Sequence, residues 1–210
     1  MENQQAPAAS GQYTFLHVGC GPLKKDRTTQ GFNDAAWREI RLDIDAQVHP
    51  DIVGTMLDMK DVASASVDAI YSCHNIEHLV AHEVPLAFKE FHRVLNDAGF
   101  LVIACPDLQA ICALVAEDKL TQPAYQSEAG PIAPIDMLYG HRRFLAGGND
   151  YMAHRCGFTK TVLQGTLIDC GFKSVIAARR LANFDLWAIA SKLPMSEDQL
   201  RSLGALHFPH

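Results

Sequence analysis

The chain has 210 residues, 48% of them hydrophobic, and a formal net charge of −6 at pH 7. This length and apolar content suffice for one domain whose core needs neither metals nor disulfides to hold it together. The negative charge, and Lys/Arg runs no longer than two residues, argue against nucleic acid or an anionic membrane as a partner.

The six cysteines are spread along the chain without a Cys-x-x-Cys pair, and no signal-peptide pattern is evident. Reduced thiols and a cytoplasmic location are therefore expected. No apolar run approaches the roughly 20 residues that a membrane-spanning helix needs, so a membrane partner is not expected. Nothing in the sequence fixes an oligomeric state.

Residues 1–12 are polar and contain Ala, Pro, Gly and Ser, which predicts a disordered leader. After them, short apolar runs alternate with helical patterns, the rhythm of an α/β fold with a mainly parallel sheet. Helices are expected within 83–97, where Pro85 suits the first turn, and within 158–172, where Thr159 suits the N-cap. The expected strands are residues 14–18, 39–44, 51–56, 67–72, 100–104, 174–180 and 184–191.

Several stretches depart from this rhythm. Segment 23–37 is poorly periodic and is expected to be a loop or a short helix. Only three residues separate the last two strands, which must therefore be antiparallel to each other if they pair. The domain expected over 13–193 is interrupted at about 106–157, and so long an interruption predicts an insertion that forms a lid or substrate wall. Residues 194–210 are expected to be a tail with a short helix.

The run FLHVGCGP ends the first strand in a glycine turn, with Gly19 and Gly21, and Asp43 follows at the end of the second strand. Glycines let a ligand approach the backbone, and an acid at the next strand tip can accept both hydroxyls of a ribose. The dinucleotide fingerprint Gly-x-Gly-x-x-Gly is incomplete, because Lys24 holds the third position. An ordinary strand-to-helix turn with a solvated Asp is the alternative.

Asp58 and Met59 come just past the third strand. In a doubly wound sheet the ends of the first three strands converge on one side of a crevice. An acid there can accept a hydrogen bond from an adenine amino group, while a methionine can pack on the ring. Taken alone, this stretch is better explained as an ordinary loop with one Asp.

Five segments together resemble the class I methyltransferases that depend on S-adenosylmethionine, in the type-11-like group. They appear in the family's order and cover most of residues 14–192. The segments are FLHVGCGP, LDIDAQVHPDIVGTMLDM, SVDAIYSCHNIEHL, FHRVLNDAGFLVIACPDL and HRCGFTKTVLQGTLIDCGF. The resemblance implies a Rossmann-like doubly wound seven-stranded sheet, mostly parallel with an antiparallel last strand, and helices on both faces.

The resemblance also implies S-adenosylmethionine as the cofactor and S-adenosylhomocysteine as its product. Gly19 and Gly21 would border the methionine part, Asp43 would bind the ribose hydroxyls, and Asp58 and Met59 would frame the adenine. Ser72, Cys73 and His74 would lie beside the transferable methyl. The full cofactor-binding set implied in this way is His17, Gly19, Cys20, Gly21, Asp43, Ile44, Asp58, Met59, Ser72, Cys73 and His74.

The chain departs from the family pattern at three places. His17 stands where many members carry an acid, and Leu23 stands where many carry a third glycine. The turn before the fifth strand reads Ala98-Gly99 rather than Pro-Gly-Gly. The change at His17 bears on how the methionine part is held, and it leaves the ribose and adenine elements in place.

A competing motif is HNIEH, His74 to His78, which matches the His-x-x-Glu-His pattern of some zinc peptidases. On one helix, the two histidines would share a face and could bind zinc. His74 instead falls at a strand tip, and the sequence places no third ligand, so no metal is expected. In the plainer interpretation Glu77 and His78 satisfy the start of a helix.

The sequence thus predicts a methyltransferase that acts on a small or medium polar acceptor, of metabolite or saccharide type. Because the sulfonium is already activated, the main task of the enzyme is to align acceptor and methyl. If the acceptor must lose a proton, His74 is the first candidate base, followed by His141 and His154. Asp107 is expected to shape the acceptor site.

Two other functions stay open on the sequence. One is a non-catalytic module that binds S-adenosylmethionine or S-adenosylhomocysteine and works through a partner, suggested by His17 and the missing third glycine. The other is a nicotinamide-dependent oxidoreductase, which the missing glycine at Lys24 and the antiparallel end of the sheet disfavour.

Overall fold

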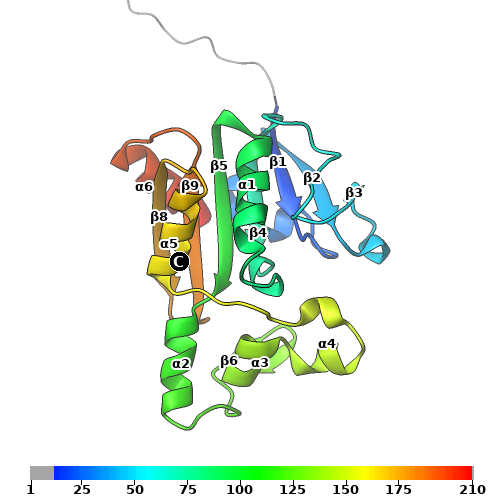
Figure 1. The fold of residues 1–210 in the computed structure, drawn as a ribbon, viewed down its shortest axis with the longest axis vertical. Coiled ribbons are helices and arrows are strands. Elements are labelled where there is room, and N and C mark those ends of the chain that lie inside the picture. Colours follow the sequence, from blue (N-terminus) through cyan, green and yellow to red (C-terminus); the bar gives the residue numbers. More distant parts are fainter. Residues whose placement is uncertain (1–11, 210) are drawn as a thin grey trace, which may run out of the picture.

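The computed structural model describes residues 12–209, so all but the last residue of the expected leader lies outside the described residues (Figure 1). A seven-stranded sheet runs through the chain in the order β3-β2-β1-β4-β5-β9-β8. Its strands are β1 (Tyr13–Val18), β2 (Trp37–Asp43), β3 (Ile52–Val53), β4 (Val67–Cys73), β5 (Leu95–Pro106), β8 (Ser174–Arg180) and β9 (Asp185–Ser191). Only β9 runs antiparallel, and it pairs with β5 and β8. The expected fold class is confirmed.

Each face of the sheet is covered by its own hydrophobic cluster. Strand β1 alternates, so that Leu16 and Val18 enter one cluster and Phe15 enters the other. The first cluster lies under α1 (Val84–Val94) and α5 (Lys160–Asp169). The second lies under the short helix η2 (Gln30–Phe32) and α6 (Glu197–His207). Burial on both faces explains why β5 and β9 read as nearly continuous apolar runs.

Several boundaries differ from those expected. The third strand, expected over 51–56, is only Ile52–Val53, because the chain then turns and Thr55 bridges back to Asp58. Segment 23–37 forms two single 3-10 turns, η1 (Lys25–Arg27) and η2. Helix α1 ends at Val94, since the chain enters β5 at the next residue.

Helix α5 begins and ends as the sequence predicts. The side chain of Thr159 accepts a hydrogen bond from the backbone N–H of Val162, which caps the first turn. After Cys170, Gly171 adopts a φ of +110°, a conformation that glycine reaches without strain.

Residues between β5 and α5 form a small layer of their own. It contains α2 (Leu108–Ala116), β6 (Tyr125–Ser127), β7 (Gly130–Ile132), α3 (Pro134–Tyr139), α4 (Arg142–Ala146) and η5 (Asp150–Met152). These elements gather beyond the carboxyl ends of β1 and β5 (Figure 1). A parallel bridge between Asp107 and Phe158 closes the layer at its base. The insertion therefore sits at the edge of the sheet where ligands bind in this fold.

Two further 3-10 turns follow strands at that edge, η3 (Ala46–Val48) after β2 and η4 (Ile76–His78) after β4. At the other end of the chain, α6 is capped by Ser196 and packs its His207 against η2. Among residues 12–209, no helix is both long and apolar enough to cross a membrane.

Candidate functional site

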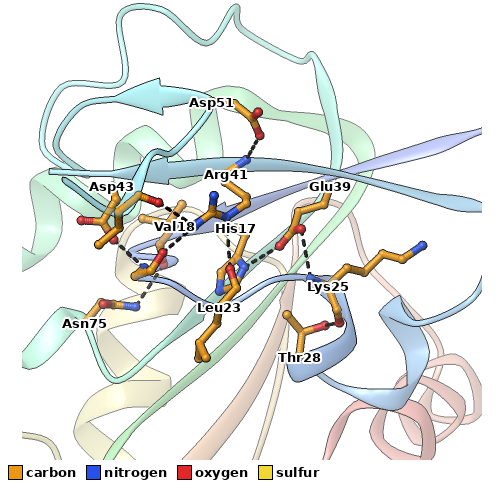
Figure 2. A network of polar contacts seen from close by, with 12 residues as sticks. His17, Val18, Leu23, Lys25, Thr28, Glu39, Arg41, Asp43, Asp51 and Asn75 are labelled. Atoms are coloured by element: carbon orange, nitrogen blue, oxygen red, sulfur yellow. Dashed lines mark hydrogen bonds and ion pairs between the residues drawn. The ribbon is translucent and has the colours of Figure 1, made fainter. Parts of the chain in front are cut away.

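The glycine turn after β1 has the geometry that requires glycine. Gly19 and Gly21 adopt φ values of +64° and +51°. A Cβ on Gly19 would lie 2.1 Å from Oδ1 of Asn75, whereas a Cβ on Gly21 would meet no atom within 4 Å among the described residues. The Asn75 amide donates to the carbonyls of Val18 and Cys73, each at 3.0 Å, and so ties the turn to the end of β4 (Figure 2). The open side of the turn is at Gly21.

Asp43 ends β2 and reaches across to this turn. Its side chain is 8% exposed, and its two carboxylate oxygens accept the backbone N–H groups of Gly21 at 2.7 Å and Asp45 at 2.9 Å. Each oxygen keeps a further lone pair with which to accept a ligand hydroxyl. Ile44, the next residue, is 48% exposed, an apolar side chain beside an acid. A ribose on Asp43 with an adenine over Ile44 fits this arrangement.

Arg41 holds the loop that carries the turn, and sequence reasoning missed it. Its guanidinium donates to the carbonyls of Gly21 at 2.5 Å, Leu23 at 3.1 Å and His49 at 2.9 Å. Figure 2 shows Arg41 beside Leu23. One planar fork thereby joins the glycine turn to the loop after β2. The sequence did contain a clue to this role: Arg41 precedes Asp43 by two residues, so both side chains lie on the same face of β2.

His17 turns away from the glycine turn. It is 3% exposed, its Nδ1 lies 2.7 Å from Oε1 of Glu39, and its ring packs edge-on against Tyr71. Oε2 of Glu39 accepts the backbone N–H of Lys25, so the pair anchors the loop that follows the turn (Figure 2). The side chain of His17 therefore has a structural contact with Glu39 and offers no exposed surface at the turn. The implied cofactor role of His17 does not agree with this placement.

The elements after β3 divide between surface and core. Asp58 is exposed, and its turn starts beside Asp43 because the N–H of Gly54 donates to the Asp43 carbonyl at 2.9 Å. Met59 is 1% exposed and packs within the first hydrophobic cluster, under α1. Met59 is therefore a core residue whose side chain is not free to frame an adenine. Ile44 and Val53 are apolar side chains exposed at this edge.

The thiols near the turn are neutral: Cys20 is buried and Cys73 is partly buried. Burial, the largest cause, raises the pKa of Cys20 to about 11, and it also raises the pKa of Cys73. Ser72 is fully buried at the end of β4. These three positions contribute small side chains and backbone at the ends of β1 and β4 rather than a thiolate nucleophile.

His74 follows β4 in a left-handed conformation, with φ of +55°, and its N–H donates to the Ala104 carbonyl. Strain of this kind clusters at functional sites. Its Nδ1 lies 3.3 Å from Oε1 of Glu77, and its Nε2 lies 3.8 Å from Oδ2 of Asp185. Desolvation lowers the pKa of His74, but Cys73 and the carboxylates of Asp185 and Glu77 together outweigh it, so the pKa is raised.

A cavity of about 210 Å³ opens between these strand ends and the insertion. His74 and Pro106 line it from the ends of β4 and β5. The insertion contributes most of the rest, and Asn183 and Phe184 come from the link between β8 and β9. The insertion residues in its lining are Tyr125, Ile132, Asp136, Met137, His141, Phe144, Met152 and His154. The three histidines proposed from the sequence therefore share one cavity.

Hydrogen bonds assign different roles to the two insertion histidines. His141 Nδ1 accepts the N–H of Arg143 at 3.3 Å, so the neutral ring carries its proton on Nε2, which is buried and unpaired among residues 12–209. His154 Nδ1 donates to the Met137 carbonyl at 2.8 Å, which leaves a lone pair on Nε2. Burial, the largest cause, lowers the pKa of His154. His141 is thus a donor and His154 an acceptor.

Asp107 does not line the cavity. It is the N-cap of α2, where Oδ1 accepts the N–H groups of Gln109 and Ala110, and its Oδ2 lies 3.0 Å from Nε of Arg179. The expectation that Asp107 shapes the acceptor site is therefore replaced by a structural role: it starts the first helix of the insertion.

Residues 16–103 match the model of a family described as methyltransferase domain. This segment runs from β1 into β5 and contains the glycine turn, Asp43 and His74. No curated protein matches the chain. The family match confirms the resemblance to class I methyltransferases that the sequence implied.

Solved structures share the fold at low identity. The citrinin polyketide synthase CMeT domain is 13% identical with a TM-score of 0.55, over 89% of this chain and 48% of that one, so this chain spans about half its length. The 1,6-didemethyltoxoflavin-N1-methyltransferase of Burkholderia thailandensis, which holds S-adenosylhomocysteine, is 14% identical with a TM-score of 0.55, over 88% and 72%. A SAM-dependent methyltransferase of Archaeoglobus fulgidus is 14% identical with a TM-score of 0.55, over 86% of each chain.

Proposed function

We propose that this methyltransferase, whose cofactor is S-adenosylmethionine, acts on a small or medium polar acceptor of metabolite or saccharide type. The observation that carries the proposal is the cavity of about 210 Å³ between the ends of β4 and β5 and the insertion. Cavities that hold small ligands have volumes of a few hundred Å³. At about 210 Å³ this cavity is smaller than the roughly 300–1,000 Å³ typical of ligand pockets, which suits one compact molecule.

The lining of the cavity suits a ring with polar substituents. Tyr125, Phe144 and Phe184 offer aromatic surface, and Asn183 and His141 offer hydrogen-bonding groups. The unpaired Nε2–H of His141 is a donor that a hydroxyl or carbonyl of the acceptor would satisfy. On this proposal the insertion at 106–157 is the acceptor wall.

On the cofactor side, Asp43 would bind the ribose hydroxyls, with Ile44 under the adenine and Asp58 near its amino group. Gly19, Cys20, Gly21, Ser72 and Cys73 would border the methionine part. When bound, S-adenosylmethionine supplies a methyl group that its positive sulfur has already activated. The chain then has to hold the acceptor in line with the methyl group and exclude water.

The three histidines of the cavity would serve the acceptor in different ways. His74 lies at the end of β4, between the cofactor side and the acceptor cavity, and would orient the acceptor beside the methyl group. His141 would donate a hydrogen bond from Nε2. His154 is held in the tautomer whose Nε2 accepts a proton or binds a cation.

A screen of polar acceptors tests the proposal. The protein is incubated with S-adenosylmethionine and each candidate, and S-adenosylhomocysteine is measured by mass spectrometry. We expect turnover on at least one class of small acceptor, and its loss in Asp43→Ala. Binding of S-adenosylhomocysteine without turnover on any acceptor would instead support a non-catalytic binding module. Thermal stabilisation by NAD but not by S-adenosylhomocysteine would support an oxidoreductase.

A further inference from the structure

Three potential metal ligands meet beside the cavity: Glu77, His78 and His154. Ligand atoms from all three lie within 4.8 Å of one another. Glu77 and His78 belong to η4, just after β4, while His154 comes from the end of the insertion. The set therefore unites two parts of the chain that are distant in sequence.

Backbone hydrogen bonds hold these two parts together. The N–H groups of Arg155 and Cys156 both donate to the Glu77 carbonyl, at 2.8 Å and 3.2 Å. The N–H of His154 donates to the Tyr139 carbonyl at 3.2 Å. The main chain thus places His154 next to η4, so the three side chains are preorganised rather than brought together by their own attraction.

Both imidazoles are held in the tautomer that binds metals. His78 Nδ1 pairs with the Ala153 carbonyl at 3.1 Å, and His154 Nδ1 pairs with the Met137 carbonyl at 2.8 Å. A carbonyl only accepts, so each Nδ1 carries the proton and each Nε2 keeps its lone pair. A second ring N–H bonded to a backbone carbonyl is the outer contact that metal-binding histidines regularly make.

The carboxylate of Glu77 has one charged neighbour, the exposed imidazole of His74, and makes no hydrogen bond within the part of the chain that the structure describes. The Glu77 side chain is 1% exposed, and neither Oε1 nor Oε2 makes a hydrogen bond to any of residues 12–209. His74 Nδ1 comes to 3.3 Å without hydrogen-bond alignment. A buried carboxylate without hydrogen bonds is costly, and a half-exposed imidazole 3.3 Å away offsets that cost only in part, so a bound cation would stabilise it further. Two imidazoles and one buried carboxylate thus bring ligand atoms within 4.8 Å of one another.

We propose that Glu77, His78 and His154 bind a divalent transition-metal ion, with Zn²⁺ as the best match. Two imidazoles and one carboxylate form a set that binds zinc and leaves a coordination position for water or substrate. The sequence argument against zinc was the missing third ligand. The structure supplies that ligand as His154, in place of His74, from the insertion.

The ion would border the acceptor cavity, because His154 also lines it. A metal there would polarise a hydroxyl of the acceptor and help it to lose its proton. This role rests on the proposed function, whereas binding of the metal does not. Metal binding can therefore be confirmed or refuted whatever the acceptor is.

Metal titration of the untagged full-length protein tests the proposal. The protein is freed of metal with a chelator and titrated with Co²⁺, whose visible absorption reports the ligand geometry, and Zn²⁺ affinity follows from competition. We expect one equivalent of each ion at a common site. Fewer than about 0.1 equivalents bound by the folded wild-type protein would overturn the proposal.

Matched substitutions assign the ligands. Glu77→Gln and His154→Gln should each weaken binding at least tenfold, since even loss of an outer partner costs 10- to 100-fold. His82→Gln, which removes an exposed imidazole nearby, should bind as the wild type does. Unchanged affinity in both ligand variants, with circular dichroism showing them folded, would mean that the cluster is a metal-free polar network. If one variant does not fold, the other and the wild-type stoichiometry decide.

Discussion

Replacing Asp43 by Asn tests the cofactor side of the site. The substitution keeps the shape of the side chain and removes its charge. In the structure Asp43 is an acceptor only: one oxygen takes the N–H of Gly21 and the other the N–H of Asp45. An Asn amide would turn a donor toward one of these N–H groups and would offer one carbonyl oxygen in place of two carboxylate oxygens.

The expected loss follows from these bonds. Hydrogen bonds to a charged group contribute about 1.5–3 kcal/mol each, and two ribose hydroxyls compete for the same carboxylate, so the losses do not add. We expect the free energy of binding to weaken by about 2–3 kcal/mol, which raises the Kd roughly 30- to 150-fold. The mispaired N–H should lower the free energy of unfolding by about 1–2 kcal/mol, and this leaves the variant folded at 25 °C.

Isothermal calorimetry with S-adenosylhomocysteine measures this loss. The matched control is Asp45→Asn, which makes the same charge change two residues away, at a side chain that caps η3 through the N–H of Gln47. The control should change the Kd by less than about threefold, since Asp45 is only partly buried and solvent screens its charge. A folded Asp43→Asn variant that binds within twofold of the wild type would refute the assignment of Asp43 to the ribose.

Three other predictions concern the surroundings of the site. Arg41→Lys keeps the charge but loses the planar guanidinium that joins three carbonyls. Urea unfolding should show a free energy of unfolding lower by about 2 kcal/mol, and calorimetry a weaker affinity for S-adenosylhomocysteine. A decrease in the free energy of unfolding below about 0.5 kcal/mol would contradict this role of Arg41. Burial lowers the pKa of His207 to about 4. The neutral ring therefore contributes fully to stability above about pH 6.5, the pKa of an unfolded histidine. As the pH falls from about 6.5 through 4, the free energy of unfolding should decrease by about 3 kcal/mol. Unfolding of His207→Phe should show a flatter pH dependence, and an unchanged slope would count against this reasoning. His141→Asn keeps an oxygen for the N–H of Arg143 but removes the Nε2–H, so turnover should fall while the affinity for S-adenosylhomocysteine stays within twofold; an equal loss of both would place His141 outside the acceptor site.

The sequence predicted the sheet well because its signals are local. Apolar runs marked the strands, and the short link 181–183 required the last two strands to be antiparallel if they paired, which they do. The third strand was predicted too long, because the turn that pairs Thr55 with Asp58 depends on tertiary contacts. The interior of the insertion was not predicted, since its helices are short and pack on one another across the layer.

The sequence predicted which residues of the site lie together only where they stand at the ends of strands. Gly21 and Asp43 do meet, because the ends of parallel neighbours lie side by side. The sequence did not predict the direction of each side chain. Met59 enters the core, and His17 contacts Glu39 on the adjacent strand. The approach of His154 to η4 depends on backbone contacts between distant segments, and no pattern of spacing reports these.

A crystal structure of the protein soaked with S-adenosylhomocysteine tests the central claim most directly. The account predicts ribose hydroxyls on Asp43, adenine against Ile44, and the sulfur near His74 at the mouth of the acceptor cavity. Absence of the ligand at millimolar concentration would contradict the account. So would a ligand seated elsewhere, for example among Arg180, Trp187 and Phe208 on the far side of β8 and β9.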